Sequence, residues 1–243
     1  MKVPAALILC VASAACAASV VVERHSGVRF RRPPHCEPSK DGVVYAYDRD
    51  LAERASSVLG VVRPRLQRIL PHDASEPEVW FLDQERVLGS DGLYLEGRSK
   101  QLIAIGTNGT RSLEFTLTHE LAHWYSHASG IELPVVVEEG LADMATMMVL
   151  PECVDAVLLL RGAASNPTSW TRQQALALTY EDWMALSGKV EMELRSIGFL
   201  LVLELGTKDL AELRETARAQ GLRRVPAEWF LGEGPGGAYA RLK

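Results

Sequence analysis

The spacing of hydrophobic and polar positions changes partway along the chain. Up to residue 106, short β-branched and aromatic runs lie between turn-forming residues, which is typical of strands. We expect these strands at residues 43–47, 77–82, 92–97 and 101–106. A short, glycine-containing connection joins the last two, so they are predicted to form a β-hairpin.

A helical period begins directly after the first of these strands. From Leu51 to Leu70, apolar residues recur three and four positions apart, and Asp48 or Asp50 can cap the start of the helix. Pro64 lies inside this segment. Because proline lacks a backbone N–H and its ring collides with the preceding turn, we expect a kink or a break there.

Helical patterns dominate the second half of the chain. Asn108 or Thr110 can cap a helix that runs to about Ala128 and stops at Gly130, and another helix is expected after Pro134. Further helices are predicted at 153–163, 170–178, 181–187, 190–205 and 208–219.

Strands therefore precede helices, which is an α+β arrangement with the helix that ends near residue 128 at the join. Residues 197–205 are apolar on all sides and predict a helix buried at the centre. The 243 residues suffice for a sizeable core. We divide the chain into a lead-in (18–42), an α+β subdomain (43–150) and a helical C-terminal subdomain (151–243).

Composition narrows the class of protein. The hydrophobic share of 47% and the charged share of 23% are typical of a globular domain. The net charge of −5 argues against a nucleic-acid-binding protein, which needs a basic face.

The N-terminal residues have the pattern of a secretory signal. A lysine precedes an apolar run, and an Ala-Cys-Ala tripeptide before residue 18 fits a cleavage site. We expect removal of residues 1–17 and a secreted or periplasmic protein without a membrane span. A transmembrane anchor and a lipid on Cys16 are the alternatives. Cys36 and Cys153 then remain, either as one disulfide or as two free thiols.

The candidate chemistry lies in the segment THELAH, residues 118–123. On a helix, His119 and His123 lie one turn apart and can aim their imidazoles at one point, with Glu120 beside them. This H-E-x-x-H spacing is typical of a zinc site whose carboxylate takes a proton from water. The alternative is an amphipathic helix with satisfied histidines. His127 continues the row by one turn, and we favour a surface position for it over a place behind a ligand.

A catalytic zinc needs a third protein ligand. No histidine follows His127, so this ligand must be a carboxylate or Cys153. The segment VVEEGLADM offers Glu138, Glu139 and Asp143, of which Glu139 and Asp143 lie four positions apart on one helical face. One of these two can bind metal while the other accepts the N–H of a ligand imidazole. The alternative is an acidic helix start stabilised by the helix dipole.

Together, THELAH and VVEEGLADM resemble motifs of the gluzincin zinc metallopeptidases, especially the small peptidase MA-like domains and, more distantly, thermolysin and the membrane alanyl aminopeptidases. The resemblance implies a zincin-like α+β fold in which a small mixed sheet and the active-site helix precede a helical C-terminal half. It implies one zinc ion held by His119, His123 and Glu139. It also implies that Glu120 is the general base.

The resemblance assigns further roles. Asp143 stands behind a ligand histidine. A strand ahead of the active-site helix pairs with an extended peptide substrate, and we place this edge at Gly92, Leu93 and Tyr94. Such enzymes stabilise the oxyanion with a C-terminal Tyr or His; no histidine remains there, and Tyr180 is the better of the two tyrosines. The Gly-x-Met-x-Asn signature of aminopeptidases is absent, which favours an endopeptidase.

The sequence thus predicts an exported zinc metallopeptidase that acts on peptides or proteins. One alternative is a zinc-binding module of the same fold that is catalytically weak or inactive and serves in binding or scaffolding. The other is a metal-free helical domain with a chance motif.

Overall fold

The computed structural model describes residues 20–22, 28–70, 74–83, 87, 91–96, 101–107, 109, 111–155, 157–158, 161, 169–186 and 188–231. The predicted signal peptide, with Cys16, lies outside these residues. Among the described helices, none has the length and apolar character needed to cross a membrane.

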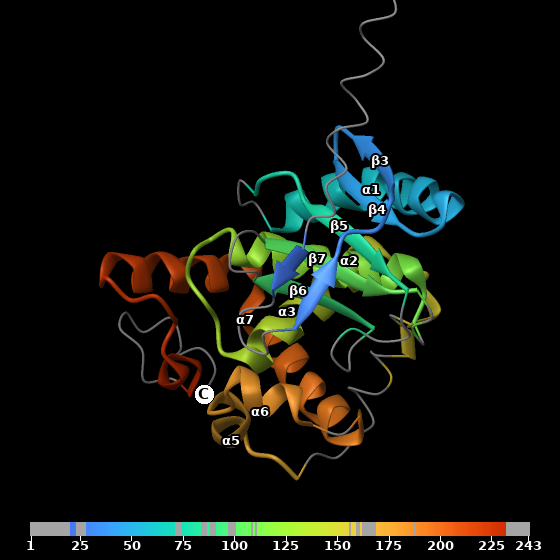
Figure 1. The fold of residues 1–243 in the computed structure, drawn as a ribbon. Helices are drawn as coiled ribbons and strands as arrows, with labels where there is room; N and C mark the ends of the chain where they lie inside the picture. The colour runs from blue at the N-terminus through green and yellow to red at the C-terminus, as the bar shows by residue number, and fades with distance from the viewer. Residues whose placement is uncertain are drawn as a thin grey trace, which may run out of the picture.

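A five-stranded mixed sheet forms one layer of the protein (Figure 1). Its strands lie in the spatial order β3 (His35–Ser39), β4 (Gly42–Ala46), β5 (Glu78–Leu82), β7 (Gln101–Gly106) and β6 (Gly92–Glu96). β4, β5 and β7 run parallel, and β3 and β6 pair antiparallel at the two sides. The α+β class and the β6–β7 hairpin predicted from sequence are therefore confirmed, and β6 is an edge strand.

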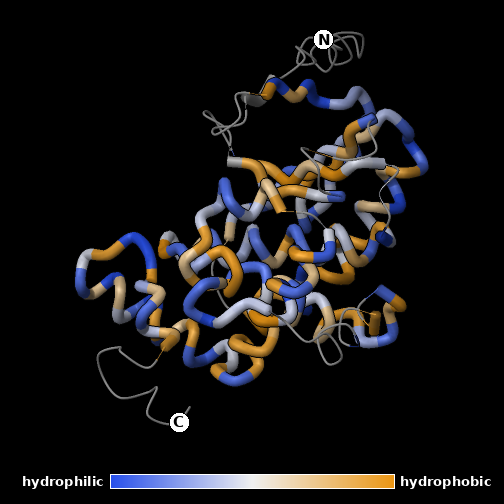
Figure 2. Tube along the Cα trace, turned by 90° about the horizontal axis from the view of Figure 1, so that it is seen from below, coloured by the Kyte–Doolittle hydropathy of each residue, from blue (hydrophilic) through white to orange (hydrophobic). Residues whose placement is uncertain are grey.

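The central strands alternate between two cores, as the pleat requires. Phe81 of β5 faces the larger core, which α1 (Arg49–Ile69) and α2 (Leu113–His127) cover, and its neighbour Trp80 faces a smaller core on the opposite side of the sheet. In Figure 2 hydrophobic segments run through the middle of the trace, and hydrophilic segments are frequent at the periphery. Burial of both faces explains why the strands are rich in apolar residues.

The lead-in contributes to the fold instead of only preceding it. β1 (Val20–Val22) pairs antiparallel with β2 (Arg29–Arg31), and β3 belongs to the main sheet. Phe30 of β2 is buried in the smaller core. Cys36 is exposed, Cys153 is half-buried, and both are free thiols, so the disulfide alternative is wrong for this structure.

Helix α1 continues through Pro64 without a break, although a kink or a break was expected there. Arg63 donates to the hydroxyl of Tyr125 at 3.1 Å, and Arg65 donates to the backbone carbonyl of Val149 at 3.1 Å. Buried residues of α1 also flank the proline on both sides. These tertiary contacts hold the helix together against the cost of an interior proline, about 3 kcal/mol.

Helix α2 begins later than expected. Its N-cap is Ser112, whose hydroxyl accepts the backbone N–H of Phe115 at 3.3 Å. The two caps predicted from sequence, Asn108 and Thr110, lie outside the described residues. Serine is a favoured N-cap because its side chain satisfies one of the free N–H groups in the first turn.

The elements that follow α2 are α3 (Val135–Val149), α5 (Arg172–Leu176), α6 (Tyr180–Met184), α7 (Gly188–Ala219) and the 3₁₀ segment η2 (Ala227–Leu231). α5 and α6 lie at the bottom of Figure 1, on the side away from the sheet. α7 consists of two helical arms that meet at Gly206, whose φ of 78° is not helical. These arms correspond to the predicted helices 190–205 and 208–219. The predicted helix 153–163 falls only partly within the described residues.

α3 and the first arm of α7 pack closely at a pair of glycines. A Cβ at Gly198 would lie 1.9 Å from the carbonyl oxygen of Val136, and one at Gly140 would lie 2.1 Å from the carbonyl carbon of Gly198. The apolar segment around Gly198 is not buried on all sides as expected, because Leu200 and Leu203 are exposed. The two glycines let the helix backbones approach, and this approach brings the polar residues of α7 to the candidate site.

Candidate metal centre

Helix α2 carries the H-E-x-x-H segment through the interior. Residues 115–126 are all buried, and the exposed fractions of His119, Glu120 and His123 are only 4%, 5% and 7%. Burial of polar groups costs free energy unless partners satisfy them. The carboxylates that face the two imidazoles come from α3.

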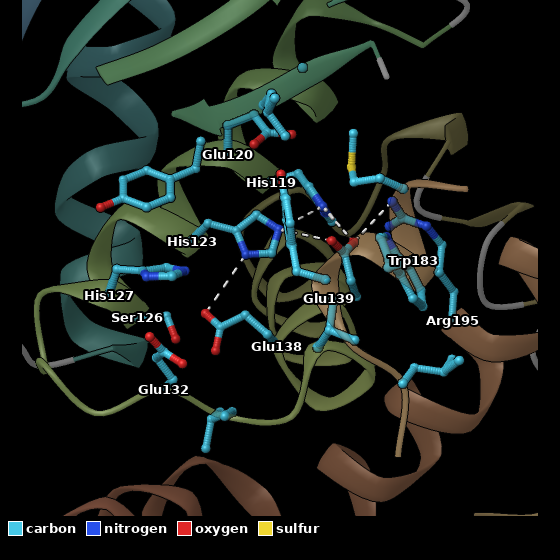
Figure 3. A pocket seen from close by; sticks show the side chains of 18 of the residues that line it. His119, Glu120, His123, Ser126, His127, Glu132, Glu138, Glu139, Trp183 and Arg195 are labelled. Atoms are coloured by element: carbon cyan, nitrogen blue, oxygen red, sulfur yellow. Dashed lines mark hydrogen bonds and ion pairs between the residues drawn. The ribbon is translucent and has the colours of Figure 1, made fainter. Parts of the chain in front are cut away.

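Two imidazoles and one carboxylate converge on a single point (Figure 3). Nε2 of His119 and Nε2 of His123 are 3.2 Å apart. The carboxylate of Glu139, on α3, places Oε2 3.4 Å from the first nitrogen and Oε1 3.7 Å from the second. One ligand atom from each of the three residues lies within 4.8 Å of the others, so the group can hold a metal ion.

The adjacent glutamate, Glu138, has a different place. Its Oε1 lies 3.7 Å from Nδ1 of His123, on the ring edge opposite to the ligand atom. Asp143 has the same relation to His119, with Oδ1 3.0 Å from Nδ1. A carboxylate on Nδ1 fixes the imidazole tautomer and leaves Nε2 as the ligand atom. Each imidazole therefore has its own carboxylate behind it.

Two arginines of α7 support these carboxylates, one on each side of the kink. Arg195 Nη1 is 3.1 Å from Asp143, and its Nη2 is 3.0 Å from Glu139. Arg214 Nη2 is 3.2 Å from Glu138, and Nε donates to the carbonyl of Ile131 at 3.1 Å. Two chains of contacts result, each running from an arginine through a carboxylate to an imidazole.

Burial and charge shift the titration of these groups in opposite directions. Burial lowers the pKa of His123, but the neighbouring carboxylates of Glu138, Glu139 and Glu120 outweigh burial and raise the pKa to about 9. Burial raises the pKa of Glu138, but His123 and Arg214 outweigh it and lower the pKa to about 2. Burial is the main reason that the pKa of Glu120 is raised. The glutamate best suited to accept a proton is therefore Glu120.

We expect the metal-free protein to lose stability as the pH rises from 6.5 to 9.5. The pKa of His123 in the folded protein lies above its ordinary value of 6.5, so its contribution to stability is fully present below pH 6.5 and is lost as the pH passes 9. The loss should be about 1–3 kcal/mol. Urea unfolding of chelator-treated protein at both pH values measures it. His123→Gln should remove most of this dependence, whereas His35→Ala, at an exposed position, should keep it. An unchanged pH dependence in His123→Gln would show that other groups cause it.

A cavity of about 430 Å³ opens beside the three ligand residues. A second cavity of about 190 Å³ shares five lining residues with it, namely Gly92, His119, Glu120, Glu191 and Arg195. The two cavities therefore meet at the candidate catalytic residues. Figure 3 shows that His127, Ser126 and Glu132 lie on one side of the ligand group, and Trp183 and Arg195 on the other. A cleft that continues to both sides leaves room for an extended chain.

The edge strand β6 runs along α2 at the mouth of this cleft. A Cβ on Gly92 would lie 2.8 Å from Cγ of Glu120, so glycine is the residue that allows the strand to approach this carboxylate. Tyr94 stacks on His127, with ring centroids 4.5 Å apart. His127 is half-buried and lines the larger cavity, so the expected surface position is wrong. Leu93 lines the same cavity and belongs to the smaller core.

Tyr180 is the first residue of α6 and lines the larger cavity. It is half-buried and packs against the smaller core. The structure places it at the cleft, and its role toward an oxyanion stays a prediction.

Three functional neighbours were not found from sequence: the position of Glu138 behind His123, and both arginines. The sequence does single out Arg195, since it is the one basic residue of the predicted helix 190–205 and lies four residues after Glu191, to which its Nε donates at 2.8 Å. Nothing in the sequence singles out Arg214, because its segment carries charges like any exposed helix.

Comparisons with protein-family models, with curated proteins and with solved structures gave no match.

Proposed function

We propose that this protein is an exported zinc metallopeptidase of gluzincin type with a zincin-like catalytic fold, in which Glu120 activates water for peptide-bond hydrolysis. The convergence of His119, His123 and Glu139 on one point, with Glu120 beside them on the cavity wall, carries this proposal. Two imidazoles and a carboxylate are the donor set of catalytic zinc in metallopeptidases.

The charge balance supports a divalent cation. Four carboxylates surround the point, those of Glu120, Glu138, Glu139 and Asp143, and all four are buried or nearly so. Two buried guanidinium groups, of Arg195 and Arg214, face them. With neutral imidazoles, two negative charges remain. A dication would neutralise them, and buried charge is costly when it is left unbalanced.

The residues of this chain then have distinct tasks. His119, His123 and Glu139 would hold the zinc, which supplies Lewis acidity toward a carbonyl and a water molecule. Asp143 keeps the ring of His119 oriented, as its 3.0 Å contact with Nδ1 indicates. Glu120, whose pKa is raised by burial, would take the proton from the attacking water and pass it to the leaving amine.

The shape of the cleft favours a polypeptide substrate cut internally. β6 is an edge strand next to the catalytic residues, and such an edge can pair with an extended peptide through Gly92, Leu93 and Tyr94. The cavities on both sides of Glu120 leave space for residues on both sides of the scissile bond. Tyr180, on the wall of the larger cavity, is the proposed oxyanion-stabilising residue.

Metal content and hydrolysis test this function together. We expect the purified protein without residues 1–17 to bind one zinc ion and to cleave casein or a mixed peptide library. His119→Ala should weaken zinc binding by more than about 100-fold, because it removes a ligand. The matched control is His127→Ala, which changes the same helix one turn beyond the ligands and should retain zinc. One bound zinc without any hydrolysis would favour the non-catalytic module, and no bound zinc would refute the metal centre.

A further inference from the structure

Arg195 is an unusual neighbour for a metal ligand. It comes from the first arm of α7, is 6% exposed, and touches three carboxylates. The distances are 3.0 Å from Nη2 to Glu139, 3.1 Å from Nη1 to Asp143 and 2.8 Å from Nε to Glu191. A guanidinium has a fixed plane and a permanent charge, so it holds several carboxylates in one geometry.

The contact with Glu139 involves the same oxygen that faces the imidazole. Oε2 of Glu139 lies 3.0 Å from Nη2 of Arg195 and 3.4 Å from Nε2 of His119. The carboxylate proposed as the third ligand is thus already bound to a cation that belongs to the protein. Asp143 is fully buried, and a buried carboxylate without a counter-charge would be strongly destabilising.

We propose that Arg195 is a positioning residue that acts as a resident counter-cation for the metal centre. It keeps Glu139 and Asp143 in their ligand geometry when no metal is bound, so the site is assembled before the metal arrives. The same positive charge opposes the charge of an incoming dication, so it makes metal binding weaker than the ligands alone would allow. This inference rests on the metal centre of the proposed function, not on peptide hydrolysis.

Arg214 provides the matched comparison. It is as deeply buried as Arg195 and comes from the same helix, but the carboxylate it holds is Glu138, which is not one of the three ligand residues. A loss of Arg214 should destabilise the zinc-loaded protein at least as much as the metal-free protein, which is the opposite of the order expected for Arg195.

The test measures zinc affinity by chelator competition and thermal midpoints with and without zinc. Arg195→Met should lower the midpoint of the zinc-free protein more than that of the loaded protein, and should tighten zinc binding about tenfold, because a full charge close to the ligands is removed. Arg195→Lys, which keeps the charge but not the planar fork, should bind zinc less tightly than Arg195→Met. Arg214→Met, which frees the carboxylate behind His123, should weaken zinc binding and not tighten it.

Several results would contradict the proposed role of Arg195. Equal or weaker zinc binding by Arg195→Met, or equal midpoint losses with and without zinc, would overturn the counter-cation role. If the zinc-free methionine variant is unfolded, Arg195→Gln, which keeps hydrogen bonding without charge, decides by the same affinity comparison. Absence of zinc binding in the wild type would refute the metal centre itself, which separates that failure from this one.

Discussion

Glu120→Gln should lower kcat/KM for peptide hydrolysis about 10²- to 10⁴-fold and leave zinc content unchanged. Glutamine keeps the size and polarity of the side chain but cannot take a proton. Glu120 directly follows His119 on α2, is 5% exposed, and is not one of the three ligand residues. A Cβ on Gly92 would lie 2.8 Å from Cγ of Glu120, so β6 passes close to the stem of this side chain. The effect should appear in kcat more than in KM.

The control for this variant lies on the same helix. Glu114 is exposed in the first turn of α2, so Glu114→Gln makes the same chemical change away from the cleft and should retain full activity. Zinc analysis of both variants excludes loss of metal as the cause. A Glu120→Gln protein that keeps wild-type activity would mean that another group, or no protein group, takes the proton.

Gly198→Ala should destabilise the protein by at least about 3 kcal/mol or prevent folding, because the new methyl group meets backbone that cannot move aside. A Cβ at this position would lie 1.9 Å from the carbonyl oxygen of Val136 and 2.9 Å from its carbonyl carbon. The two helices would have to separate. Urea unfolding of wild type and variant, with circular dichroism as the probe, measures the loss.

Gly188→Ala is the matched control for Gly198→Ala. Gly188 is the exposed first residue of the same helix, and nothing lies within 4 Å of a Cβ built there. Its replacement should change stability by less than about 1 kcal/mol. A Gly198→Ala protein as stable as this control would show that α3 and α7 do not pack as closely as described.

The close contact of α3 and α7 at the two glycines also affects the candidate metal centre. Arg195 lies on α7 three residues before Gly198, and Glu139 lies on α3 directly before Gly140. A separation of the helices at the two glycines would draw the guanidinium away from the carboxylate. A folded Gly198→Ala protein should therefore show altered zinc affinity together with reduced stability.

Much of the local structure was determined by the sequence itself. Alternation and apolar runs identified β4, β5, β6 and β7, with the β6–β7 hairpin, because side-chain burial in a sheet follows the chain directly, whereas β3 was missed and assigned to the lead-in. The four-residue spacing of His119 and His123 was enough to place their imidazoles together, since neighbours on a helix surface are set by helix geometry alone. The spacing of Glu139 and Asp143 on the next helix likewise holds in the structure.

Local rules failed where distant contacts outweighed them. Pro64 was expected to interrupt α1, but Arg63 and Arg65 bind residues of α2 and α3 on either side of it. His127 was expected at the surface, but the stacked ring of Tyr94 from the edge strand covers it. In both cases the deciding partner lies more than thirty residues away, and spacing along one helix contains no information about it.

The sequence by itself determined which helix bears the candidate ligands and which residue types the site contains. Only the tertiary structure decided how the acidic residues divide their tasks, with Glu139 toward the ligand atoms and Glu138 behind His123. It also decided that Arg195 and Arg214 complete the site, because the bend at Gly206 directs both arms of α7 toward it. The physical reason is the distance along the chain: these arginines meet their carboxylates 52 to 76 residues away, through the packing of α7 on α3.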